Sequence, residues 1–495
     1  MKNIKIVITV LLIGFIGVGC DEDAFLEEAP VSAISTLTFF QNEEHFKQSV
    51  NAAYTDLRTL AGSSLNYEGG FWAFGEMRSD NSTYQLNEVD QSGHRFWHLN
   101  DFLMDSGNEI LSPNWNACYQ GIGKSNIVLE YIEDIEVPNK EQYIGEVRFL
   151  RALYYFFLVR HWGDVPLVVR TAKTYQEAFE MNKRAPSSMV YDLIIEDLNY
   201  AKQVLPLSHT GNNVGRATSG AARTLLAKVL MYNHRYSEAI PELTAVIGSG
   251  QYQVLDDYAS VFNINNENND EIVFSVQFIT GPYGLHGENM YRFTPWNSSD
   301  ILPHPQVTAR TGMNIPTQDL INSFEEGDLR LNMIDTTYID EQYGTYRGNI
   351  VPYTKKQWDP GHVQHRQAGH DFHLLRYPLV LLKLAECYLR EGGGDPVPLV
   401  NQVRERAGLP ALSSVTLEDI IHERRVEFHC EADRWDVLVR TGIVNEVMTA
   451  HGQRERANRP LAIGPNAFQR IKILYPIPAA VISNDPTFPQ NPEHQ

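Results

Sequence analysis

The stretch Glu146–Leu167, EVRFLRALYYFFLVRHWGDVPL, decides the fold class of this chain. Its large apolar side chains recur at three- and four-residue intervals, the spacing that places them on one face of a helix. They are Phe149, Leu150, Leu153, Phe156, Phe157 and Trp162. The stretch therefore predicts a long helix with a broad buried face, followed by a turn at Gly163.

Two further stretches repeat this plan of a long apolar helix, a break and a shorter helix. In 218–250 the break falls near His234, and we expect Ser237 to cap the second helix. In 376–408 the break is a run of glycines. All three stretches have a small residue within the first helix, which allows close packing of a second helix, as in tetratricopeptide repeats. Because their spacing is irregular, we predict a mostly α-helical, tetratricopeptide-like scaffold of helix-turn-helix pairs with insertions.

Long loop insertions are predicted at about 62–113 and 251–367. Both regions are polar, rich in glycine and asparagine, and contain large aromatic residues. Loops of this length in a compact protein are usually functional or disordered, and the aromatic content argues against disorder. We therefore expect a helical scaffold that holds aromatic-bearing loops.

These loops contain the best candidates for a ligand site. Sugar rings stack on tryptophan and tyrosine, and neighbouring arginine, asparagine and aspartate side chains can orient the bound ligand. The predicted ligand contacts are Trp72, Arg78, Asp80, Asn81, Trp97, Tyr283, Arg292 and Trp296. The alternative is that these residues anchor the long loops to the scaffold.

The sequence gives little support for a metal site or a nucleotide-binding site. Gly123, Lys124 and Ser125 complete the end of a phosphate-loop motif, but Cys118 replaces its first glycine and the segment is expected to be helical. Four histidines, at 362, 365, 370 and 373, share no helical face, and 263–271 lacks the spacing of a calcium loop. We predict no metal and no cofactor.

No sequence motif predicts catalysis. The acidic residues of 423–436 recur at four-residue intervals beside arginines, which is typical of salt-bridged helix packing. The nucleophile-elbow, zinc-protease and dinucleotide-binding motifs do not occur in the chain. We therefore expect a binding protein and assign no catalytic residue.

The formal charge is −20, from 41 basic and 61 acidic residues, which argues against nucleic acid as a partner. Residues 1–19 have the build of an export signal: a lysine-containing start, then an apolar run too short to span a bilayer. Cys20 follows at the expected cleavage point, where a bacterial lipoprotein signal carries its lipidated cysteine. Plain cleavage, with Cys20 incidental, is the alternative.

Several motifs, in order, resemble the SusD/RagB family of Bacteroidetes outer-membrane lipoproteins. These are FLEEAPVSAIS at 25–35, RALYYFFLVRHWGDVPL at 151–167, ERRVEFHCEADRWDVLVRTG at 423–442 and ILYPIPAAVISNDPTFPQNP at 473–492. The acids after Cys20 resemble the signal such lipoproteins carry for display on the outer face of the cell. In the tail, Asp485 is inserted before the proline of the family pattern.

The resemblance implies one SusD-like helical domain over 20–495 after a signal peptide at 1–19. It implies a lipid-anchored, surface-exposed protein of the outer membrane that binds a nutrient, usually an oligosaccharide. It also implies that the protein acts as a lid on a SusC-like TonB-dependent transporter. Two alternatives stay open: a peptide- or siderophore-binding member of the same family, and a glycan-cleaving enzyme, which needs two carboxylates about 5–10 Å apart.

Overall fold

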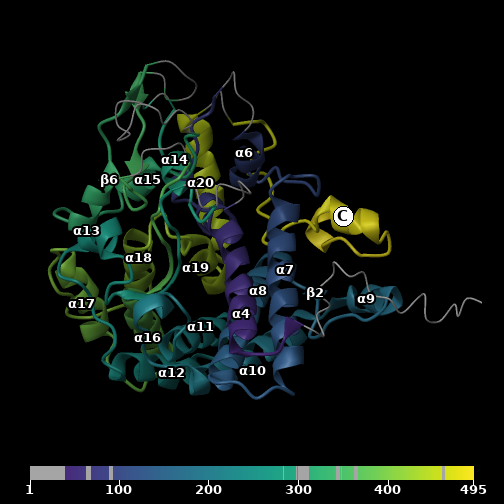
Figure 1. Ribbon diagram of the computed structural model, residues 1–495. Coiled ribbons are helices and arrows are strands. Elements are labelled where there is room, and N and C mark those ends of the chain that lie inside the picture. The colour runs from purple at the N-terminus through teal and green to yellow at the C-terminus, as the bar shows by residue number, and fades with distance from the viewer. Residues whose placement is uncertain are drawn as a thin grey trace, which may run out of the picture.

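The computed structural model describes residues 39–62, 69–87, 93–281, 284–296, 298, 311–341, 346, 348–361, 366–459 and 463–495. Long helices form its lower body, and short strands and helices gather at the upper end (Figure 1). We refer to that upper end as the loop end. The signal segment 1–19, Cys20 and the resemblance at 25–35 lie outside the described residues.

Consecutive antiparallel helix pairs build the body. Each helix packs on the next along the chain, and α12 then packs on α16, which bridges the larger insertion. The helices are α4 (Glu43–Ala61), α7 (Leu111–Ile132), α8 (Lys140–Trp162), α10 (Ser187–Val204), α11 (Ser219–Tyr232), α12 (Tyr236–Gly248), α16 (Tyr377–Glu391) and α17 (Val397–Arg406). The predicted tetratricopeptide-like, mostly helical scaffold is confirmed.

The helix breaks lie where the periodicity placed them. α8 ends at Trp162, before Gly163 with φ +72°, and α11 and α12 are separated at His234, whose φ is +58°. The predicted cap at Ser237 is wrong, because α12 already begins at Tyr236 and no side chain caps it. The hydrophobic pattern therefore predicts the helix ends better than the candidate capping residue does.

The insertions contain short regular elements rather than plain loops. The smaller insertion contains α5 (Gly70–Trp72), a π-helix (Ala73–Met77), β1 (Ser82–Thr83) and α6 (His94–Asn100). The larger one contains α13 (Tyr258–Val261), β4 (Ile272–Val276), α14 (Asn289–Arg292), β5 (Ile315–Pro316), α15 (Gln318–Ile321), β6 (Ile334–Asp335), β7 (Ile339–Asp340), β8 (Asn349–Ile350) and β9 (Tyr353–Thr354). β10 (Phe372–Arg376) follows it. Within the described segments every sheet has two antiparallel strands: β1–β5, β4–β10, β6–β9, β7–β8, and β2 (Val165–Pro166) with β3 (Arg184–Ala185).

The C-terminal part closes the body beside the loop end. α18 (Leu417–Glu427), α19 (Arg434–Thr441) and α20 (Val444–Asn458) are followed by a tail that contains α21 (Ala479–Asn484). A separate projection consists of β2 (Val165–Pro166), α9 (Tyr175–Met181) and β3 (Arg184–Ala185), at the right of Figure 1. Among the described helices, none combines the length and apolar character that crossing a bilayer requires.

Candidate functional site

A groove at the loop end is the most suitable ligand site, and we call it the loop-end groove. It has a volume of about 560 Å³, within the ~300–1,000 Å³ typical of small-molecule sites. Its lining residues are Thr83, Pro316, Thr317, Gln318, Ile321, Thr336, Tyr346, Asn349, Ile350, Pro352, Glu455, Asn458 and Arg459. The larger insertion supplies nine of these residues. Glu455, Asn458 and Arg459 come from the C-terminal end of α20 and the residue that follows it.

The β1–β5 ribbon fixes one wall of the groove. Thr83 lies opposite Ile315 in this ribbon, and Thr317 follows directly as the N-cap of α15. The Thr317 hydroxyl accepts from Leu320 N at 3.1 Å and donates to the Asp80 carbonyl at 2.8 Å. This wall therefore joins the two predicted insertions, which are distant in sequence.

An ion pair whose two charges balance forms the base of the groove. Glu455 is buried, and its Oε2 accepts from Thr83 Oγ1 at 2.9 Å and from Arg459 Nε at 2.6 Å. The Arg459 guanidinium also lies over the Tyr84 ring at 4.5 Å. Burial would raise the pKa of Glu455, but Arg459 outweighs it and holds that pKa below its ordinary value. The base therefore presents an ionised pair with no net charge.

The rim combines one aromatic ring with several solvent-reaching polar groups. Tyr346 is half-buried beside Glu455 and Arg459, and burial raises its phenol pKa to about 12. Gln318, Asn349 and Asn458 are exposed amides on three different elements. An aromatic face among amides, over a base without net charge, suits an uncharged polyhydroxylated ligand such as a sugar.

The predicted contacts Trp72 and Trp97 lie in the hydrophobic core, so their assignment as ligand contacts is wrong. Trp72 is fully buried and stacks on Phe96 with ring centroids 5.1 Å apart. Trp97 is 6% exposed and stacks on Tyr84 at 5.5 Å. Trp97 thus lies one layer behind the groove, where it supports the tyrosine beneath Arg459.

Arg78 is also buried and serves the fold. Its guanidinium lies 4.0 Å from the Tyr475 ring centroid and 4.9 Å from those of Phe102 and Trp435. One of its nitrogens donates to the Lys472 carbonyl. A cation enclosed by three rings has no surface left for a ligand.

Asp80 and Asn81 are buried against the C-terminal helices. Asp80 accepts two bonds from Arg434, at 2.8 and 2.9 Å, and burial, which would raise its pKa, is outweighed by Arg434 and Arg425. Asn81 donates to Glu76 at 3.0 Å and accepts from Arg425 at 2.8 Å. Both residues position the groove wall through their backbones, so their prediction as ligand contacts is also wrong.

The remaining three predicted contacts have different positions. Arg292 is buried, donates to Glu288 Oε1 at 2.8 Å and lies over Phe96, so the structure contradicts its role as well. Trp296 is half-buried at the loop end, where its carbonyl accepts from Tyr338 beside β7 at 2.7 Å. Tyr283 lies outside the described residues. Trp296 and Tyr283 stay predictions.

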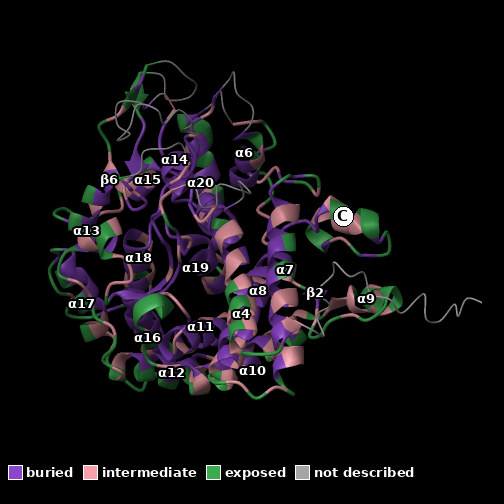
Figure 2. Cartoon of the chain, in the orientation of Figure 1, coloured by how far each residue is buried: buried purple, intermediate pink, exposed green. Residues whose placement is uncertain are grey.

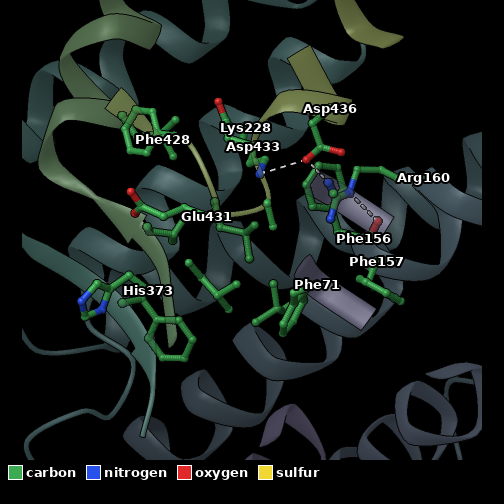
Figure 3. A pocket seen from close by; sticks show the side chains of 18 of the residues that line it. Phe71, Phe156, Phe157, Arg160, Lys228, His373, Phe428, Glu431, Asp433 and Asp436 are labelled. Carbon is green, nitrogen blue, oxygen red and sulfur yellow. Dashed lines mark hydrogen bonds and ion pairs between the residues drawn. The ribbon is translucent and has the colours of Figure 1, made fainter. Parts of the chain in front are cut away.

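A second cavity, in the interior, is too small for a sugar (Figure 3). Its volume is about 50 Å³, comparable to one or two waters at ~30 Å³ each. Asp436 pairs there with Arg160 and with Lys228, the latter at 3.1 Å. The Lys228 pKa is lowered by burial, which Asp436 partly offsets. This cavity belongs to the packing of α8 and α11 against α19.

The acidic stripe at 423–431 is a buried ion-pair network, as its spacing indicated. Glu427 accepts from Arg376 at 2.9 Å and from Arg406 at 2.6 Å, and Arg376 also donates to Glu431 at 2.6 Å. Over the described part of the chain, no group of three or more histidine, cysteine or acidic residues is arranged to hold a metal ion. His370 and His373 are buried, and His362 and His365 lie outside the described residues.

Sequence reasoning missed Tyr346, Glu455 and Arg459. Tyr346 carried a usable signal, since it lies within the predicted insertion between two glycines, Gly344 and Gly348. Glu455 and Arg459 carried none, because an acid and a base four residues apart are typical of any exposed helix. Only the contact of α20 with Thr83 of β1 makes them part of a groove.

Two family models match the chain. One, described as "Starch-binding associating with outer membrane", matches residues 24–231, and one described as "SusD family" matches residues 336–494. The SusD-like protein P25 of Formosa agariphila is 28% identical over 502 residues, which cover 90% of this chain and 92% of the relative.

Solved structures share the fold. Surface glycan-binding protein A from Bacteroides uniformis aligns with a TM-score of 0.76 at 23% identity, covering 90% of this chain and 99% of that one. The protein of the same name from Bacteroides thetaiotaomicron, in complex with laminarihexaose, aligns with a TM-score of 0.75 at 22% identity, covering 91% and 100%.

Proposed function

Since this chain belongs to the SusD/RagB family, we propose that it is a surface lipoprotein that captures an oligosaccharide in the loop-end groove. The observation that carries the proposal is the composition of the groove: a half-buried tyrosine and solvent-reaching amides over a charge-balanced base. The laminarihexaose complex of a structural relative supports glycan as the ligand class.

Capture would combine stacking with hydrogen bonding. One sugar face packs on Tyr346, and Gln318, Asn349 and Asn458 bond hydroxyl groups. We propose Trp296, whose carbonyl accepts from Tyr338 next to β7, as a further aromatic contact. We propose Tyr283, in the same insertion, as a further contact.

The bound glycan is handed to a SusC-like TonB-dependent transporter, for which this protein is the lid. Handover requires modest affinity, because a nanomolar complex corresponds to ~12 kcal/mol and dissociates slowly. Cys20, once lipidated, tethers the body at the outer face of the outer membrane. The family membership supports this placement.

Binding rather than cleavage fits the groove. A glycosidase needs two carboxylates ~5–10 Å apart. In the described lining of the groove the one carboxylate is Glu455, which is ion-paired with Arg459. A peptide or siderophore would need more charged groups than this lining offers.

The test is a glycan array with the mature chain, residues 20–495, followed by product analysis on every hit. We expect neutral glycans among the hits, each recovered intact. If the chain bound no glycan on the array but did bind peptides, glycan capture would be overturned. Shortened products would contradict a pure binding role.

A further inference from the structure

The projection formed by residues 165–185, which we call the β2–α9 arm, stands apart from the body. It leaves the body through the β2–β3 ribbon, in which Val165 lies opposite Ala185. α9 lies at the right edge of the molecule, beyond the helical body (Figure 1). None of its residues is buried, in contrast to every long helix of the scaffold (Figure 2).

The arm exposes apolar surface to solvent. Tyr175 is 86% exposed, the most of the large hydrophobic residues described, and Val169 is 46% exposed. Phe179 lies four residues after Tyr175 and is half-buried, so both rings share one face of α9. Exposed apolar surface next to polar residues is typical of an interaction site.

The arm is ordered by its own hydrogen bonds. Thr174 caps α9 by accepting from Glu177 N at 3.2 Å, and Lys173 N donates to Glu177 at 2.7 Å. At the base, Arg184 donates to the carbonyls of Asp164 at 2.7 Å and Pro489 at 3.0 Å. The apolar face is thus held outward instead of folding back onto the body.

The N-terminal segment enters the body beside the base of the arm. Asn126 of α7 donates to the Val168 carbonyl at 2.9 Å, and Tyr131, further along the same helix, stacks on Phe40 at 5.1 Å. The segment from Cys20 to Phe40 spans at most about 70 Å when fully extended. A lipid on Cys20 therefore keeps the arm within reach of the bilayer.

The charge of the arm differs in sign from that of the chain. Four basic residues, Arg170, Lys173, Lys183 and Arg184, accompany two acidic ones, Glu177 and Glu180. The whole chain has a formal charge of −20. Basic segments are attracted to anionic lipid, at about 1 kcal/mol per Lys or Arg near the surface, and tyrosine favours the headgroup layer.

We propose that the β2–α9 arm rests on the anionic lipid surface to which the chain is tethered, with Tyr175 and Phe179 in the headgroup layer. This placement depends on the proposed lipid anchor but not on glycan binding.

The test uses the mature chain coupled through Cys20 to maleimide lipid. The other cysteines, Cys118, Cys387 and Cys430, are buried, so Cys20 is the thiol that reacts. The vesicles are phosphatidylcholine with about 30% phosphatidylglycerol, a typical anionic content. The readout is amide hydrogen exchange of residues 174–182, compared with the same chain coupled to soluble maleimide–polyethylene glycol.

We expect exchange in 174–182 to slow roughly three-fold or more on the vesicles, as for a segment newly shielded from water. The double variant Tyr175→Ser, Phe179→Ser should lose this protection. Leu207→Ser, which removes a 56% exposed side chain outside the arm, should keep it. Both variants should retain wild-type glycan binding in solution, so a failure of the proposed function is seen separately.

Equal exchange on vesicles and on polyethylene glycol would overturn the proposal. So would protection that survives the double variant. Protection seen only when the transporter is reconstituted in the same vesicles would also contradict it and assign the arm to a protein partner.

Discussion

Tyr346 is the residue on which ligand stacking at the loop-end groove depends. Replacing it with alanine removes the one aromatic ring of the described lining, while the half-buried position leaves the core intact. We expect Tyr346→Ala to weaken glycan binding by ~1–3 kcal/mol with unchanged stability. Isothermal calorimetry with the best array hit measures the first quantity and urea unfolding the second.

Trp72→Ala is the matched contrast. Its ring is fully buried in the core, so we expect a loss of stability of ~3–5 kcal/mol. Wild-type glycan affinity in Tyr346→Ala would show that this residue does not contact the ligand. Wild-type stability in Trp72→Ala would contradict the core assignment.

Glu76 predicts a pH dependence of stability. Its carboxyl is buried, which raises its pKa from about 4.5 to about 7, although Cys430 N and Asn81 donate to Oε1 at 2.9 and 3.0 Å. A raised folded-state pKa stabilises the fold below the unfolded pKa, and this contribution is lost as pH rises through 7.

The variant Glu76→Gln keeps the acceptor oxygen but cannot ionise. We expect the unfolding free energy of the wild type to fall relative to the variant by up to roughly 3 kcal/mol between pH 5 and 8. Parallel pH profiles from urea unfolding of both proteins would show that Glu76 does not titrate in this range.

The residues around Glu76 show why part of the site could not be predicted. Trp72, Arg78 and Asp80 belong to a glycine- and asparagine-rich segment whose pattern is typical of a loop. Arg78 and Asp80 are buried against partners more than 350 positions away, Lys472 for Arg78 and Arg434 for Asp80, and Trp72 stacks on Phe96 and Phe293. Short-range patterns contain no information about such pairs, so residue types suited to sugar binding predict ligand contacts at positions that the structure buries.

At the scale of elements, close helix packing depends on Gly121 of α7. A Cβ built there would lie 2.2 Å from the Tyr154 ring of α8, and the Tyr154 hydroxyl reaches past α7 to the Ala53 carbonyl of α4 at 2.8 Å. We expect Gly121→Ala to destabilise the protein by ~1–3 kcal/mol through overpacking, despite the better helix propensity of alanine. Thermal unfolding measures this effect.

Gly123→Ala is the control, because a Cβ at that position meets no atom within 4 Å. This variant should be neutral or slightly stabilising. Similar melting temperatures for the two variants would contradict the packing of α7 against α8.

The buried ion-pair network joins β10, α17 and α18. Arg376 is fully buried and pairs with Glu271, Glu427 and Glu431. Removing its charge takes one cation away from three buried carboxylates that the remaining Arg330, Lys356 and Arg406 must then balance, so we expect Arg376→Met to cost ~3–5 kcal/mol. Because buried pairs are poorly screened, raising the salt concentration in urea unfolding should not mimic the mutation.

The exposed pair Arg235 and Glu238 provides a control, since Arg235→Met should change stability by less than ~1 kcal/mol. Equal small effects at both positions would show that the network does not stabilise the fold.

The helices themselves could be predicted, because large apolar side chains recur at helical spacing over the 23 residues of α8 and the 15 residues of α16. The short strands could not. β1 and β5 have two residues each and pair across more than 230 positions, so no local periodicity marks them. The loop-end groove depends on that ribbon. Its walls therefore could not be predicted from the sequence, whereas the helical scaffold could.

At the scale of the whole molecule, the loop-end groove and the β2–α9 arm lie at different places on one scaffold (Figure 1). The groove lies among the elements of the larger insertion and α20, and the arm lies near the entry of the N-terminal segment. The two proposals thus assign ligand capture and membrane attachment to different parts of the chain.

Hydrogen-exchange mapping of the mature chain with its best array glycan tests the central claim most directly. We expect the added protection to fall on residues 315–321, 346–352 and 455–459, which line the loop-end groove, and to disappear in Tyr346→Ala at the same glycan concentration. Protection centred elsewhere on the body, with these three segments unchanged, would contradict the groove as the glycan site.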